Sequence, residues 1–107
     1  MKIPTDYRGF IRLAKKRNVK LTPGGTSAKK GCLMTLISIA FLEDGSFLPY
    51  TRGQDYAIEN LGLDKTLGLE DGFEDCLKTN ETATYNRYYK VGQRLREYAL
   101  ANSGKVG

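Results

Sequence analysis

Hydrophobic residues recur at helical spacing along most of this chain, and no segment shows the sustained alternation of a β-strand. The first such stripe consists of Tyr7, Phe10, Ile11 and Ala14, which follow the i, i+3, i+4, i+7 rule. Thr5 or Asp6, after Pro4, is placed to cap this helix, and Asn18 to end it. The pattern therefore predicts a first helix with one buried side.

The most apolar segment follows a turn at residues 22–25, whose Pro and Gly residues favour reversal of the chain. Its apolar residues are Cys32, Leu33, Met34, Leu36, Ile37, Ile39, Ala40 and Phe41. They surround most of a helix rather than one stripe, which is typical of a buried helix. We expect this second helix to be the central one, ended by residues 43–45.

A third helix is indicated by Thr51 and Gln54, which have the spacing of a capping box. It is expected to run to Leu61, with Gly62 as its C-terminal cap. Its inner face would consist of Ala57, Ile58 and Leu61. A further short helix over residues 64–75 would turn Leu69 and Phe73 inward, although Gly68 and Gly72 each cost about 1 kcal/mol relative to Ala in a helix.

The last and longest helix is capped by Thr82 or Asn80, and its apolar stripe is regular. The stripe consists of Tyr85, Tyr88, Gly92, Leu95 and Ala99. The fold class predicted is all-α, a compact bundle of four or five helices. Short extended pieces at 19–21 and 46–48 could pair as a minor two-stranded ribbon. We expect one domain over residues 1–107, with flexible ends at 1–5 and 102–107.

Charge is segregated along the chain, which has a formal net charge of +5. Residues 1–30 carry nine of the 17 Lys and Arg residues and a single acid, Asp6. Residues 43–81 carry ten of the 12 Asp and Glu residues. Such asymmetry bears on the choice of partners and not on the fold.

The residue types narrow the chemistry. The chain has no His, which removes the usual general base near neutral pH and the Ser/His and Cys/His nucleophile pairs. Cys32 and Cys76 are too few for a structural zinc site and are expected to be reduced thiols of a cytoplasmic protein. No apolar run approaches the ~20 residues of a membrane span. We therefore expect a protein without enzymatic activity, cofactor or metal.

Four acidic residues are clustered, namely Glu70, Asp71, Glu74 and Asp75. On a helix, the pairs four positions apart lie one turn from each other. Such carboxylates could hold a divalent cation or form an acid–base pair. The alternative is a solvated face or a set of intramolecular partners for the basic segments. No EF-hand pattern is present.

Two groups of basic residues are candidate binding surfaces. The first consists of Arg8, Arg12, Lys15, Lys16, Arg17 and Lys20, with Lys29 and Lys30 in the following loop; the second consists of Arg87, Lys90 and Arg94. They could neutralise phosphates, with Tyr89 and Tyr98 stacking on bases. They are equally the ordinary outer faces of amphipathic helices, and no nucleic-acid recognition motif accompanies them.

Several short motifs together resemble a family of small uncharacterised bacterial and phage helical proteins. They are a cysteine-started helix at 31–36, the segment 57–62, the aromatic–polar–Asp triplet 73–75 and a Thr-capped final helix. The resemblance spans about residues 6–100 and implies a helical fold, often in a phage or mobile-element context, with no established activity. The triplet here is Phe-Glu-Asp where that family tends to have Trp-Asn-Asp. A structural account fits it equally: Phe73 anchors the loop in the core and Asp75 caps a helix or turn.

The leading functional hypothesis is a small adaptor or inhibitor that works by binding another protein. Charge-segregated surfaces of this kind speed association and select partners. The alternative is a nucleic-acid-binding protein that uses the two basic groups. The oligomeric state is left open by the sequence.

Overall fold

The computed structural model describes residue 4 and residues 6–17, 20–23 and 50–103. These contain α1 (Tyr7–Lys16), α3 (Tyr50–Leu61), α4 (Leu63–Phe73) and α5 (Ala83–Ser103), and no strand. The all-α prediction is confirmed for this part of the chain. The predicted helix over 32–41, the ribbon piece at 46–48, Lys29 and Lys30 lie outside the described residues.

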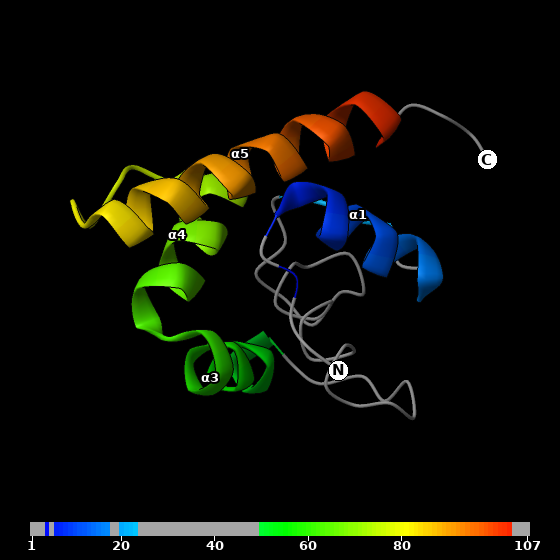
Figure 1. The fold of residues 1–107 in the computed structure, drawn as a ribbon. Coiled ribbons are helices and arrows are strands. Elements are labelled where there is room, and N and C mark those ends of the chain that lie inside the picture. Colours follow the sequence, from blue (N-terminus) through cyan, green and yellow to red (C-terminus); the bar gives the residue numbers. More distant parts are fainter. Residues whose placement is uncertain (1–3, 5, 18–19, 24–49, 104–107) are drawn as a thin grey trace.

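Among the described helices, α5 is the longest, and two of the others pack directly against it. Both α4 and α1 pack on it, and α3 packs on α4. Figure 1 shows α4 beneath the N-terminal half of α5 and α1 beside its C-terminal half. The core between them is formed by Phe10, Leu13, Ala14, Leu21, Ala57, Leu69, Phe73, Tyr88, Leu95 and Ala99. None of the helices in the described residues is long and apolar enough to cross a membrane.

α1 begins where the sequence predicts. The Asp6 carboxylate accepts a hydrogen bond from the Gly9 N–H at 2.8 Å, as an N-cap does. Phe10, Leu13 and Ala14 are buried, while the predicted stripe residues Tyr7 and Ile11 are half-buried. Tyr7 and Ile11 nevertheless pack against the core. The helix ends at Lys16, with Arg17 rather than Asn18 in the cap position.

One glycine both ends α3 and starts α4. Gly62 has φ +94°, and its N–H donates to the Ile58 carbonyl at 2.9 Å. Its own carbonyl accepts hydrogen bonds from the Thr66 N–H at 3.2 Å and hydroxyl at 2.9 Å. The predicted end of the third helix at Leu61 and Gly62 is confirmed. α3 begins at Tyr50, so Thr51 lies within its first turn instead of preceding it.

Glycines allow α4 and α5 to touch through their backbones. A Cβ atom added at Gly68 would lie 2.6 Å from the Tyr85 carbonyl oxygen, and one added at Gly92 would lie 2.8 Å from the Phe73 nitrogen. At Gly72 the added atom would meet the Tyr89 carbonyl group more closely still. From the sequence alone, Gly68 and Gly72 are expected only to disfavour helix formation. Their larger effect is tertiary, because side chains at these positions would hold the two helices apart.

Both predicted caps of α5 take part in its start. The Thr82 hydroxyl oxygen accepts a hydrogen bond from the Tyr85 N–H at 3.1 Å. The Asn80 side-chain oxygen accepts from the N–H groups of Glu81 at 2.7 Å and Thr82 at 3.1 Å. The Asp64 carboxylate of α4 accepts from the Asn80 amide and the Thr82 hydroxyl, each at 3.1 Å. The predicted α5 stripe is buried in full.

Candidate functional site

A groove of about 610 Å³ lies where the start of α1 meets the first half of α5. Its lining residues are Asp6, Tyr7, Ala83, Asn86, Arg87, Lys90, Val91 and Arg94. Ala83, Arg87, Lys90 and Arg94 follow one another at intervals of three or four residues, so they share one face of α5. We call this hollow the Tyr7 groove. Its floor is apolar and its rim is cationic.

The guanidinium group of Arg94 is held against an aromatic ring of α1. Its central carbon lies 3.6 Å from the centroid of the Tyr7 ring. Such a cation–π contact contributes about 0.5–1 kcal/mol at an exposed site. Arg94 is therefore restrained at the rim of the groove, beside the apolar floor.

The phenol of Tyr7 lies in the positive electrostatic potential of nearby arginines. Its pKa is lowered, first by a hydrogen bond with Arg8 and then by the charge of Arg94, with burial acting in the opposite direction. Asp6 opposes these cations, but weakly. Two basic groups that are distant in sequence thus act on one tyrosine.

The structure joins part of the two predicted basic groups. Tyr7 lies against Arg94, and Ala14 shares a hollow of about 110 Å³ with Ala99, so α1 runs alongside α5 in the same direction. The charges of Arg8 and Arg94 consequently both act on the Tyr7 phenol. The remaining members on α1 and after it are exposed, apart from the half-buried Arg17; they are Arg12, Lys15, Lys16 and Lys20. The second group, Arg87, Lys90 and Arg94, stays together at the groove.

Tyr89 is not placed to stack on a nucleic-acid base. It is only 7% exposed, and its hydroxyl donates to the Cys76 carbonyl at 2.6 Å. The Lys78 ammonium lies 5.2 Å from its ring centroid. The expectation that Tyr89 offers an open aromatic face is wrong. Tyr89 lies next to Tyr88 on the buried side of α5, and its ring packs against the α4–α5 loop.

The four residues of the acidic cluster have separate environments. The Asp71 carboxylate accepts hydrogen bonds from the Tyr85 hydroxyl at 2.6 Å and the Thr79 hydroxyl at 3.1 Å. Glu70 accepts one from the Gln54 amide of α3 at 2.8 Å. Burial, followed by the charges of Asp71 and Glu74, raises the pKa of Glu70 to about 7.

The other two members lie where α4 ends. Glu74 is the C-cap residue of α4. Asp75 is exposed and has φ 58°, in the turn that follows. Within residues 50–103 and the described N-terminal pieces, no three His, Cys, Asp or Glu side chains are grouped so that they could hold a metal ion.

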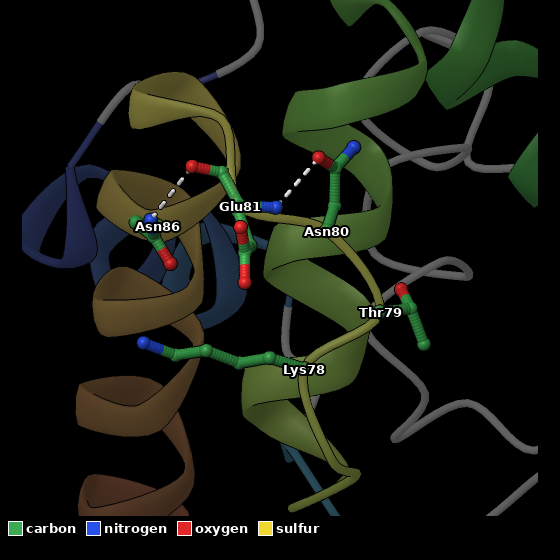
Figure 2. Close-up of a pocket in the computed structure, with 5 residues that line it drawn as sticks. All are labelled: Lys78, Thr79, Asn80, Glu81 and Asn86. Atoms are coloured by element: carbon green, nitrogen blue, oxygen red, sulfur yellow. Dashed lines mark hydrogen bonds between the residues drawn. The ribbon is translucent and has the colours of Figure 1, made fainter.

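A second hollow, of about 820 Å³, is wide, polar and formed by the loop between α4 and α5. Figure 2 shows its lining residues, with the Lys78 side chain extended beneath Asn86 and Thr79 pointing the other way. Asn86 donates to the Glu81 carbonyl at 3.3 Å, and the Glu81 N–H donates to Asn80. These polar groups bind one another and hold the loop in place. The Tyr7 groove is the better candidate, because the cations of α5 line an apolar floor.

Comparisons with known proteins add no family to this picture. No protein-family model, curated protein or solved structure matches the chain. The function is therefore argued from the geometry of the Tyr7 groove.

Several residues of the groove were not among the candidates from sequence; they are Asp6, Tyr7, Ala83, Asn86 and Val91. Asp6 and Tyr7 were interpreted only as a cap and a core residue. The signal that could have pointed to the site is the cationic face of α5, which lies next to its buried stripe. The contribution of α1 depends on helix packing and carries no local sequence signal.

Proposed function

We propose that the protein is a non-enzymatic adaptor or inhibitor that binds a partner protein through the Tyr7 groove. The observation that carries this proposal is the arrangement of Arg87, Lys90 and Arg94 around an apolar floor, with Arg94 held on Tyr7. An apolar centre with a polar, charged rim is the anatomy of protein interfaces. The cationic rim selects a partner surface that is acidic.

A protein partner is favoured over nucleic acid by the state of the tyrosines. Binding of single strands uses open aromatic faces on which bases stack. Of the two tyrosines expected to stack on bases, Tyr89 is buried, and Tyr98 is half-buried and lies in a separate hollow with Ala99. Nucleic-acid binding is kept as an outcome of the test.

The cellular setting is part of the same proposal. The motifs that resemble small bacterial and phage proteins support a cytoplasmic accessory factor of a phage or mobile element. A small chain with a charge-segregated surface suits this role.

The experiment is affinity capture from the cells that carry the gene, with and without nuclease, followed by quantitative mass spectrometry. The test variant is Arg87→Glu with Lys90→Glu, which reverses the rim. The matched control is Arg12→Glu with Lys16→Glu, which makes the same charge change on exposed positions of α1. Circular dichroism verifies that both variants fold.

We expect captured proteins that survive nuclease treatment and the control change but are lost with the rim variant. Retention on DNA or RNA is measured in parallel at low and moderate salt. If capture depends on nucleic acid, or if both variants lose it equally, the proposal is wrong. Turnover of a defined substrate would overturn the non-enzymatic part.

A further inference from the structure

We infer that the Tyr7 groove takes a short acidic segment of a protein chain, with an aliphatic side chain inserted between its carboxylates. This inference rests on the proposed function and names the chemistry of the partner. The hollow of about 610 Å³ lies within the range of sites for small ligands, about 300–1,000 Å³. It is too small for a folded domain and of a size for a few residues of extended chain.

The floor of the groove selects an apolar side chain. It is formed by Tyr7 and Val91, both half-buried and packed against the core, and by the exposed Ala83 at the first position of α5. Because Tyr7 and Val91 are fixed by the core, the floor is preformed. An aliphatic side chain that covers it removes apolar surface from water on both partners, which is favourable.

The rim selects carboxylates and sets their spacing. At a rise of about 1.5 Å per residue, Arg87 and Lys90 are about 4.5 Å apart along the axis of α5, and Lys90 and Arg94 about 6 Å. Carboxylates on alternate residues of an extended chain are about 7 Å apart. Neighbouring side chains of an extended chain point to opposite faces, so the aliphatic residue must lie two positions from each acidic residue to share their face. The two carboxylates are then about 14 Å apart. Flexible acidic side chains can still reach Arg87 and Arg94, which are about 10.5 Å apart along α5, while the aliphatic side chain covers the floor between them.

The charged residues that line the groove also favour a peptide over a nucleic-acid backbone. Arg94 is stacked on Tyr7 with its charge presented at the edge of the floor. Asp6 lies in the same lining and would face any anion that filled the groove continuously. In the peptide, uncharged residues separate the carboxylates and can lie against Asp6, whereas an unbroken polyanion carries a charge at every position.

The test uses a defined probe, the peptide acetyl-Gly-Glu-Gly-Leu-Gly-Glu-Gly-amide, titrated by NMR. Two comparison peptides replace Leu by Ser, or every Glu by Gln, and oligothymidylate serves as the polyanion. We expect the Leu peptide to bind about 10-fold more tightly than the Ser peptide, as burial of one Leu side chain predicts. The Gln peptide should lose binding, and oligothymidylate should bind more weakly than the Leu peptide.

Two variants locate the binding in the groove. Ala83→Trp fills the hollow without any change in charge and should weaken the Leu peptide about 10-fold. Lys16→Glu changes an exposed charge away from the groove and should leave the affinity unchanged. The Tyr7 phenol gives an independent readout: carboxylates bound at the rim offset the charge of Arg94, so the tyrosine pKa should rise on saturation with the peptide.

The outcomes separate this inference from the proposed function. If proteins are captured through Arg87 and Lys90 but the Leu and Ser peptides bind equally, the partner is a folded acidic surface and the inference is wrong. If the Leu peptide does not bind at millimolar concentration, or if oligothymidylate binds more tightly, the inference is also overturned. If capture fails as well, both ideas are wrong.

Discussion

Asp75 has a backbone conformation that favours glycine. Its N–H donates to the Gly72 carbonyl, and the Cys76 N–H donates to the Asp71 carbonyl at 2.9 Å. These two hydrogen bonds form the Schellman arrangement that ends many helices, with Asp75 in the left-handed position at φ 58°. Any residue other than Gly costs about 1 kcal/mol or more in this conformation, although Asp tolerates the left-handed region better than most residues.

We therefore expect Asp75→Gly to increase the free energy of unfolding by about 0.5–1 kcal/mol. Urea denaturation followed by circular dichroism measures the change. Asp75→Asn is the matched control, since it also removes the charge but retains a side chain at the left-handed position. An equal gain in both variants would assign the effect to charge and not to backbone conformation.

At this scale the sequence predicts some residues well and others not at all. Phe73 as a core anchor is confirmed, because burial of an aromatic ring depends on local pattern. The C-cap of α4 is Glu74, and Asp75, which was expected to cap a helix or turn, takes the left-handed position that follows it. Arg94 on Tyr7 was not predicted. That contact requires α1 to lie beside α5, and nothing in either segment specifies the neighbour.

At the scale of helices, the close crossing of α4 and α5 depends on glycines, which have no Cβ atom to hold the two backbones apart. Gly→Ala in a helix interior ordinarily stabilises by about 1 kcal/mol through helix propensity. At Gly72 the added methyl group would meet the backbone of α5 at Tyr89, which cannot rotate away. We expect Gly72→Ala to lower the free energy of unfolding by about 1–3 kcal/mol in spite of the gain in propensity.

Thermal and urea unfolding measure this loss. Glu97→Ala, an exposed position of α5, is the control and should have little effect. A more stable Gly72→Ala protein would show that the two helices are not in backbone contact.

The same crossing explains which elements the sequence predicts. The stripes of α1 and α5 and the break at Gly62 are visible locally, and each is confirmed. Helix propensity alone disfavours a helix over the segment 64–75, because Gly68 and Gly72 lie inside it. Their spacing of four residues, which places both on one side of α4, was the available signal for close packing.

At the scale of the whole molecule, folding brings together basic residues that are far apart in the sequence and gives several acidic residues partners within the same chain. The groups at the two ends of the sequence meet in part at Tyr7, whose phenol is affected by both Arg8 and Arg94. The acidic residues Asp64, Glu70 and Asp71 accept hydrogen bonds from side-chain amides and hydroxyls of the same chain. Composition predicted the signs of these regions. It did not predict that three carboxylates hold the α3, α4 and α5 regions together.

Glu70 makes the stability of the whole fold depend on pH. Its pKa is raised to about 7 from an ordinary 4.5, first by burial and then by the charges of Asp71 and Glu74. The folded protein therefore holds this proton more tightly than the unfolded chain does. The stabilisation is complete below about pH 4.5 and is lost as the pH rises through 7, so this group lowers the Tm between pH 5 and 8.

Glu70→Gln removes the titration and retains an oxygen that accepts the hydrogen bond from Gln54 at the α3–α4 contact. We expect its Tm to depend less on pH between 5 and 8 than that of the wild type, with the largest gain over the wild type at pH 8. Glu59→Gln, an exposed carboxylate of α3, should leave the wild-type slope unchanged. The measurement is thermal unfolding at constant ionic strength. A slope that Glu70→Gln does not alter would show that Glu70 is ionised throughout this range, and the burial at the α3–α4 contact would then be looser than the structure shows.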